Sequence, residues 1–234
     1  MIPFTVPLRE GRLLRRYKRF LADVAFPDGS VEVVHCPNPG AMMGLDTAGA
    51  RAFVSVSDSR TRKLPMTLEI VEADGTLVGI NTNRPNALFA AAILAGTVPE
   101  LAGYVRLRRE VPYGRASRVD IVLESPDRPP AYVEIKNVHL MRRPGLAEFP
   151  DCVTARGARH LAELADVAAA GGRAVMAFVV QRRDCDRVAI AADLDPVYAK
   201  GFAEARRAGV EVIAYACEVT TDGIGVERRV AIVD

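Results

Sequence analysis

Short apolar runs separated by turn residues fill the first third of the chain. Asp28-Gly29 and Asp74-Gly75 between these runs are typical of hairpin turns. A stretch broken by prolines and glycines, residues 35–44, cannot continue a strand or a helix and predicts a shaped loop. The apolar runs span residues 11–26, 31–35, 52–57, 66–72 and 76–80. Five short strands predict a small barrel of the OB type over residues 1–82, a fold that commonly binds oligonucleotides.

From residue 83 onward, helical and strand patterns alternate. Pro85 fits the start of a helix at 86–95, and Asp151 is well placed to cap a second helix at 153–169. A third helix is predicted at 196–208. Strands are predicted at 104–111, 119–123, 132–138, 174–181 and 210–215, with one or two edge strands in 220–233. The pattern predicts a second domain, residues 83–234, of α/β type with a mixed central sheet, so the whole chain is α+β.

Charged residues interrupt two neighbouring predicted strands of this second domain. Asp120 lies in the first, and Glu134 and Lys136 lie two positions apart in the second, so their side chains point to one face of the sheet. Burying such groups costs several kcal/mol unless they pair or bind a cation. One interpretation is a structural ion pair between Glu134 and either Lys136 or Arg118.

The other interpretation is catalytic. Carboxylates with open positions are what Mg²⁺ or Mn²⁺ needs, so Asp120 and Glu134 are candidate metal ligands. Lys136 is then placed to hold an attacking water or to neutralise charge on a phosphate. An Asp followed on the next strand by Glu-x-Lys is similar to the signature of the PD-(D/E)XK nuclease superfamily. Glu110 is a further candidate carboxylate, or a cross-strand partner of an arginine.

Segments along nearly the whole chain resemble the sugar fermentation stimulation protein A family. They are LRRYKRFLAD at 14–23, HCPNPGAM at 35–42, RKL at 62–64, NTNRPN at 81–86, SRVD at 117–120, VEIKNV at 133–138 and FPDCVTARGARHL at 149–161. The chain departs from the family pattern at Pro39, usually Thr, and at Cys152, usually Ala. The resemblance implies an OB-like barrel, a PD-(D/E)XK nuclease-like domain, sequence-independent DNA binding and a regulatory role in sugar use. Asn86 occupies a place where some nucleases of the superfamily carry an acid, which weakens a second metal site.

Basic residues form three clusters, at 9–19, 60–63 and 106–118, the first with Tyr17 and Phe20 interleaved. Such clusters are typical of proteins that bind a phosphate backbone and stack bases, whereas a solvated charged face is the alternative for any one cluster. Asn38 in the loop, and Arg156 and His160 on the predicted helix, could also contact phosphates, or serve a turn and a charged stripe. The candidate DNA-binding residues are Arg15, Arg16, Lys18, Arg19, Asn38, Arg62, Lys63, Arg118, Arg156 and His160.

Composition narrows the remaining classes. Four cysteines far apart and three histidines support neither a zinc site nor a disulfide framework. The sequence contains no P-loop, G-x-G-x-x-G or G-x-S-x-G motif and no run as long as a membrane span, so we expect a cytoplasmic protein. The predicted function is sequence-independent DNA binding with a metal-dependent phosphodiesterase site. The alternative is an effector-binding regulator without nuclease activity, and a homo-oligomer stays open.

Overall fold

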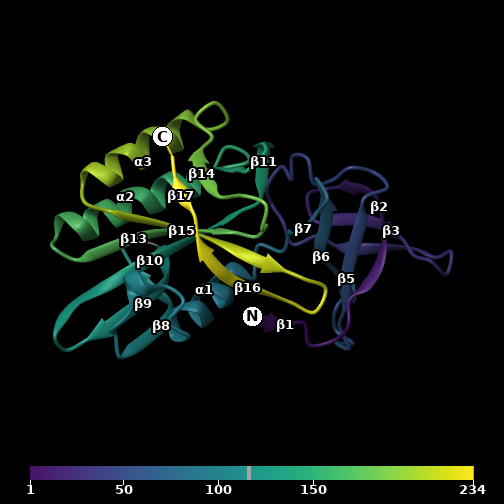
Figure 1. Ribbon diagram of the computed structural model, residues 1–234, viewed down its shortest axis with the longest axis horizontal. Coiled ribbons are helices and arrows are strands. Elements are labelled where there is room, and N and C mark those ends of the chain that lie inside the picture. Colours follow the sequence, from purple (N-terminus) through teal and green to yellow (C-terminus); the bar gives the residue numbers. More distant parts are fainter. Residues whose placement is uncertain (115–116, 234) are drawn as a thin grey trace.

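The computed structural model describes residues 1–114 and 117–233, so Arg115 of the third basic cluster lies outside the described residues. An N-terminal barrel lies beside a larger domain with a central sheet (Figure 1). The barrel strands are β2 (Arg9–Tyr17), β3 (Leu21–Ala25), β4 (Val31–His35), β5 (Arg51–Val56) and β6 (Met66–Ala73). A further strand, β7 (Thr76–Gly79), pairs antiparallel with β6. Their order is β4-β3-β2-β5-β6, and a parallel pairing of His35 with Thr67 joins β4 to β6. This closed barrel of five strands confirms the predicted OB-type fold.

One predicted apolar run is a hairpin. Residues 11–26 contain β2, a turn and β3, and the turn residues Lys18 and Arg19 have φ angles of 49° and 63°. Left-handed turns normally carry Gly, Asn or Asp, so the sequence offers no turn signal at these positions. The turn therefore became visible only in the folded chain.

The larger domain is built on a mixed sheet of seven strands, in the order β1-β16-β15-β13-β10-β9-β8. Its strands are β1 (Ile2–Pro3), β8 (Arg106–Tyr113), β9 (Ser117–Ser125), β10 (Arg128–Val138), β13 (Arg173–Val180), β15 (Glu211–Val219) and β16 (Gly223–Arg229). Strands β10, β13 and β15 run parallel, and their neighbours are antiparallel. The mixed sheet was predicted. The pairing of β1 with β16 was not, and it places the start of the chain in this sheet before the chain enters the barrel.

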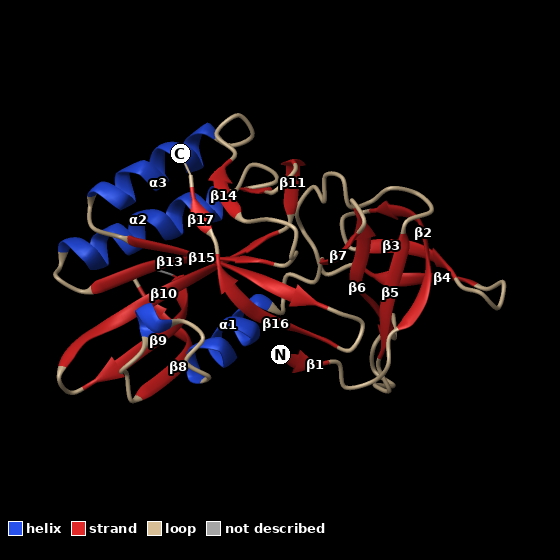
Figure 2. Ribbon diagram, viewed as in Figure 1, coloured by secondary structure: helices blue, strands red, loops and turns tan. Residues whose placement is uncertain are grey.

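Helices cover both faces of this sheet (Figure 2). Helix α1 (Pro85–Leu94), followed by the short 3₁₀ turn η1 (Pro99–Leu101), packs on one face, and α2 (Ala155–Ala169) and α3 (Pro196–Arg207) pack on the other. In β13, Val175 and Ala177 face α1, whereas Met176 and Phe178 face α2 and α3. Because both faces of β13 are buried, its sequence is a continuous apolar run rather than an alternating one.

The predicted cap of α2 is wrong. Thr154 caps the helix, since its Oγ1 accepts a hydrogen bond from Gly157 N at 3.0 Å. Asp151 instead accepts a hydrogen bond from Met42 N of the barrel loop at 3.1 Å and lies 3.4 Å from His139 Nε2. It therefore joins the two domains rather than beginning a helix.

A second, smaller sheet was also not predicted. It contains β11 (Leu140–Arg143), β12 (Leu146–Phe149), β14 (Arg187–Ile190) and β17 (Ala231–Ile232). These strands have at most four residues each, too few to show a periodic pattern.

Buried polar side chains hold the barrel against the larger domain. Arg182 is only 1% exposed, and its guanidinium pairs with Asp74 of the barrel at 3.0 Å and donates to His139 O at 3.1 Å. Gln181 Nε2 donates to Asn81 O at 3.3 Å and to Asn137 Oδ1 at 2.7 Å. These bonds fix the position of one domain relative to the other.

Two expectations from composition can be compared with the fold. All four cysteines are free thiols, three buried and Cys152 half-buried. Within residues 1–114 and 117–233, none of the helices has the length and apolar character needed to cross a bilayer.

Candidate functional site

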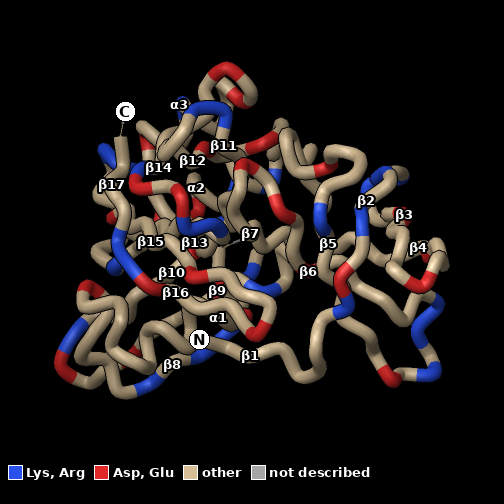
Figure 3. Tube along the Cα trace, turned by 45° about the vertical axis from the view of Figure 1, so that its right-hand side comes forward, with Lys and Arg blue, Asp and Glu red and all other residues tan. Residues whose placement is uncertain are grey.

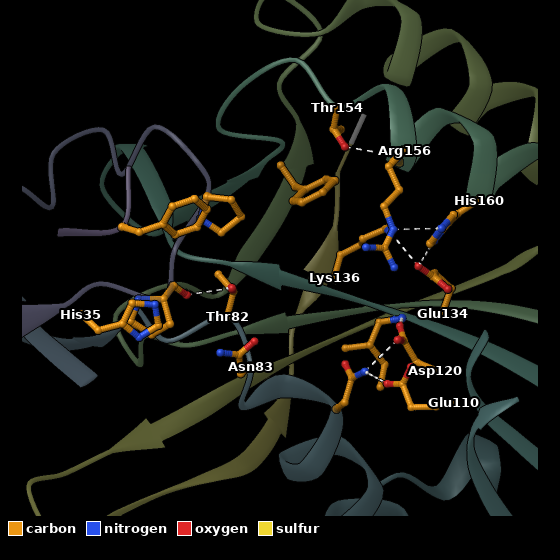
Figure 4. A pocket seen from close by; sticks show the side chains of 17 residues that line it. His35, Thr82, Asn83, Glu110, Asp120, Glu134, Lys136, Thr154, Arg156 and His160 are labelled. Atoms are coloured by element: carbon orange, nitrogen blue, oxygen red, sulfur yellow. Dashed lines mark hydrogen bonds and ion pairs between the residues drawn. The ribbon is translucent and has the colours of Figure 1, made fainter. Parts of the chain in front are cut away.

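A cleft of about 540 Å³ lies where the barrel meets the larger domain (Figure 4). Phe20, His35, Pro37 and Pro39 line it from the barrel side. The remaining lining residues are Thr82, Asn83, Asn86, Glu110, Asp120, Glu134, Ile135, Lys136, Phe149, Thr154, Arg156, Gly157 and His160. The three predicted catalytic residues therefore share one cleft.

Glu134 and Lys136 lie on the face of β10 that meets α2. The alternation along the strand directs both side chains to this face, and Lys136 Nζ lies 2.8 Å from Glu134 Oε1. His160 of α2 is 3% exposed, and its Nδ1 is hydrogen-bonded to the same Glu134 oxygen. Burial favours a neutral Glu134, but the His160 hydrogen bond and the Lys136 charge outweigh it and lower the pKa of Glu134. The carboxylate is thus held in its ionised form.

The second oxygen of Glu134 is different. Glu134 is 2% exposed, and its Oε2 atom is buried without a hydrogen-bond partner among the described residues. Burying an ionised oxygen without a partner costs free energy. We therefore expect a positively charged ligand to bind at this oxygen. The predicted ion pair with Lys136 exists, yet it satisfies only half of this carboxylate.

Asp120 closes the gap where two strands separate. Pairing between β9 and β10 ends at Ile121 and Val133, and the next free backbone donor, Ile135 N, is bound by Asp120 Oδ2 at 2.7 Å. Burial, together with the negative charge of Glu134, raises the pKa of Asp120 to about 6. Asp120 thus lies close enough to Glu134 for the negative charge of Glu134 to oppose its ionisation, and a cation bound between them would relieve this repulsion.

Glu110 approaches Asp120 through a backbone distortion. Its φ angle is 52°, in the left-handed region that a glutamate rarely adopts, and its neighbours Arg109 and Val111 pair with the residues on either side of Asp120. The Asn86 amide bridges the two acids, donating to Asp120 Oδ1 at 2.7 Å and to Glu110 Oε1 at 3.1 Å. Glu110 thus belongs to the carboxylate group and not to an arginine pair.

These donors fit a hard cation with an incomplete protein shell. Within the described ranges, no group of three or more His, Cys, Asp or Glu side chains is arranged to hold a metal ion. A Mg²⁺ site does not require three protein ligands, because Mg²⁺ keeps several waters and binds through one or two carboxylates plus phosphate oxygens. Asp120 and the unpaired oxygen of Glu134 supply that number.

Two of the candidate phosphate contacts are structural. Asn38 is fully buried, with its Nδ2 donating to Ile80 O at 3.0 Å and its Oδ1 accepting from Gly40 N at 3.0 Å. Arg16 donates from NH2 to Asn38 O at 2.8 Å and to Gly40 O at 2.7 Å. Both side chains shape the loop at 35–44, so Asn38 cannot reach a phosphate without leaving the core.

His160 and Arg156 both line the cleft, but in different ways. His160 is buried against Glu134, and the exposed Arg156 donates from Nε to His160 Nε2 at 3.3 Å. The predicted solvated stripe is therefore wrong for His160, which lies behind the carboxylate. Of these two residues, Arg156 is the one whose side chain is exposed to a ligand in the cleft.

The other basic candidates lie on the surface. Lys18 and Arg19 are exposed on the turn next to Phe20, and the remaining four are exposed elsewhere. None of these six residues is among those that line the cleft. Of those four, Arg15 pairs with Asp23 at 2.7 Å and Arg62 donates to Thr67 Oγ1 at 2.9 Å, and the others are Lys63 and Arg118. Figure 3 shows basic and acidic positions interspersed over both domains, with a basic stretch along β2.

Sequence reasoning missed several residues of the cleft. His35, Thr82, Asn83, Phe149 and Thr154 line it from loops and strand ends. The available signal was the family resemblance, because all five fall in the segments at 35–42, 81–86 and 149–161. Gln181 is not among the residues that line the cleft, and its side chain binds Asn137 and the domain junction.

Family comparisons agree with this architecture. Residues 14–80 match the description "SfsA N-terminal OB domain", and residues 83–223 match "Sugar fermentation stimulation protein RE domain". The chain belongs to the sugar fermentation stimulation protein family. Homologs of this protein from Rhodospirillum centenum and Brucella ovis are 58% and 54% identical over 225 and 231 residues. The alignments cover 96% and 99% of this chain and 97% of each homolog.

A solved structure of the family has the same fold. The SfsA protein of Pyrococcus furiosus, determined in complex with Ca²⁺, superposes with a TM-score of 0.90 at 27% identity. The match covers 100% of this chain and 98% of that protein. The SfsA family assignment inferred from the sequence segments is thereby confirmed, together with the order of the barrel and the mixed-sheet domain.

Proposed function

We propose that this protein is a DNA-binding, metal-dependent phosphodiesterase whose site is formed by Asp120, Glu134 and Lys136. The observation that carries the proposal is the buried, unpaired Oε2 atom of Glu134 in the cleft that also contains Asp120 and Lys136. The Ca²⁺ bound by the Pyrococcus furiosus relative supports a site for a hard divalent cation in this fold. Magnesium or manganese is the cation we expect here.

The side chains have distinct roles in this proposal. Asp120 and Glu134 hold the cation, which when bound polarises the phosphate and lowers the pKa of a coordinated water. Lys136 Nζ, 2.8 Å from Glu134, holds the attacking water and balances negative charge on the phosphate. His160 and Asn86 position Glu134 and Asp120 through the hydrogen bonds described above.

We expect DNA binding to be independent of sequence, because the available side chains contact phosphates and not bases. Lys18, Arg19 and Arg156 are exposed cations at or beside the cleft, and cations of this kind bind phosphates without reading bases. Binding should therefore weaken steeply with salt, with a log-log slope of about −0.9 per phosphate contacted on duplex DNA.

The test is a cleavage assay with Mn²⁺ or Mg²⁺ on single-stranded, nicked and branched DNA. We expect Asp120→Ala and Lys136→Ala each to lower the rate about a hundredfold or more, since both remove metal or acid-base contributions. Arg143→Ala, a change at an exposed residue outside the cleft, is the control and should cleave at the wild-type rate. Cleavage that persists in both site variants would identify a contaminant and refute the proposal.

A further inference from the structure

The turn between β2 and β3 has an unusual backbone for its residues. Lys18 and Arg19 are both left-handed, at φ 49° and 63°, a conformation that costs free energy in residues with long side chains. Phe20 follows with its side chain 45% exposed, although Phe20 O is tied to Cys36 N at 2.8 Å. Two cations and an aromatic ring are thus presented together on a rigid turn. The exposed ring of Phe20 is therefore available to pack against a ligand.

This turn faces the carboxylate site across the cleft. Phe20 lines the cleft from the barrel side, and Asp120 and Glu134 line it from the sheet. Arg19 lies close enough to the larger domain to affect Cys152. Burial and the charge of Asp151 raise the pKa of the Cys152 thiol, and the positive charge of Arg19 lowers it in part. The buried Arg182 holds the two domains in this arrangement. The ring and the carboxylates therefore form two walls of one site.

The dimensions of the cleft limit what can enter. Its volume of about 540 Å³ is that of a pocket for a ligand of roughly drug size, comparable with a nucleotide or two. This space suits one or two unpaired nucleotides better than a duplex, whose bases are paired and stacked inside the helix. A single strand exposes its base faces, which are then free to stack on an aromatic ring.

We propose that the cleft accepts a single nucleic-acid strand, with one base stacked on Phe20 and its phosphate directed to Asp120 and Glu134. Lys18 and Arg19 bind phosphates on the barrel side, and Arg156 binds them on the side of α2. This inference rests on the proposed function, because it names the form of substrate that the same site takes. Duplex DNA then reaches the carboxylates only at frayed ends, flaps or gaps.

A tryptophan reporter tests the position of the strand without any cleavage. The chain contains no tryptophan, so Phe20→Trp places a single tryptophan on the cleft wall, whose emission can be excited apart from that of the tyrosines. With EDTA present, a mixed-sequence single-stranded oligonucleotide should quench this fluorescence to saturation, and a blunt duplex of the same sequence should not. Val31→Trp, at an exposed position of β4 outside the cleft, is the matched control and should show no quenching.

Truncation tests the contribution of the ring. Phe20→Ala should weaken binding of the single strand about five- to a hundredfold, the range expected for loss of one base-aromatic stack, and Val31→Ala should leave it unchanged. Phe20 is 45% and Val31 58% exposed, and neither belongs to the buried core, so both variants should melt near the wild-type temperature.

The outcomes separate this inference from the proposed function. Equal quenching by duplex and single strand, or unchanged single-strand affinity in Phe20→Ala, would overturn the inference even if metal-dependent cleavage is found. Selective quenching by single strands supports it even if the phosphodiesterase assay fails.

Discussion

The Asn86 amide lies between two acidic side chains and donates to Asp120 Oδ1 over 2.7 Å. The same Nδ2 atom donates to Glu110 Oε1 at 3.1 Å, so one neutral residue joins two carboxylates that would otherwise repel each other. This bond makes Asn86 a positioning residue of the site. An amide at this position therefore has a structural role of its own, which is to hold the two carboxylates together.

Replacing this amide by an acid should couple folding to metal. We expect Asn86→Asp to lower the melting temperature in EDTA, because a third carboxylate then faces Asp120 and Glu110. The increase in melting temperature on adding Mn²⁺ should be larger than in the wild type, since a ligand that binds more tightly stabilises the folded state more at the same concentration.

Asn83→Asp is the matched control, because Asn83 lines the same cleft and makes no side-chain bond to these acids. Equal Mn²⁺ responses in the wild type and Asn86→Asp would contradict a cation site at these residues.

His160 should contribute to stability through Glu134. Removing it in His160→Ala leaves a buried carboxylate short of one partner, which should cost about 1–3 kcal/mol in the free energy of unfolding. Glu134→Gln alone and the double variant complete the cycle. Urea unfolding should give a double-variant loss smaller than the sum of the single losses, because the two side chains form one interaction. Additive losses would mean that the hydrogen bond is energetically unimportant.

Asp151 should make the domain junction sensitive to acid. Burial favours its neutral form, but the hydrogen bond and charge of His139, with the bond from Met42 N, lower the pKa of Asp151 to about 2. The unfolded value is near 3.8, so the ionised group stabilises the folded state above pH 4. This contribution should disappear as the pH falls from about 4 to 2.

Unfolding followed between pH 7 and 2 tests this dependence. Asp151→Asn should remove the part of the acid sensitivity between pH 4 and 2, and Asp222→Asn, at an exposed position, should preserve it. An unchanged profile in Asp151→Asn would exclude the junction as the source.

Asp120 has the opposite effect on the pH dependence. Because its pKa is raised to about 6, its contribution to the stability of the folded state increases as the pH falls through 6.

Arg182 should be the most costly arginine to remove. Its side chain is 1% exposed, pairs with Asp74 and Asp184, and donates to the backbone oxygen of buried His139. Arg182→Ala leaves that buried oxygen without its donor and should cost about 1–3 kcal/mol. The adjacent Arg183 is mostly exposed and pairs with Glu218, and Arg183→Ala should change stability by less than about 1 kcal/mol. Urea denaturation of both variants measures the difference, and similar losses would contradict a structural role at the junction.

Elements whose pattern is local could be predicted from the sequence. A period of two places Glu134 and Lys136 on one face of β10, and the uninterrupted apolar run of β13 requires cover on both faces. Turn residues between short apolar runs predicted the strands of the barrel. The family segments led to the domain order. Each of these inferences uses only residues near one another in the chain, whose spacing is readable before folding.

Contacts between residues far apart in the chain depend on the folded structure. Packing of α2 on the sheet brings His160 to Glu134, 26 positions away in sequence, and no periodicity encodes that contact. Glu110 and Lys18 adopt left-handed backbones that their residue types do not favour, so only surrounding contacts explain them. Asn38 appeared as a phosphate contact because a loop asparagine is usually exposed, whereas here Ile80 and Gly40 satisfy it in the core. Burial and hydrogen-bond partners depend on the whole fold, and for that reason the composition of a short segment does not reveal them.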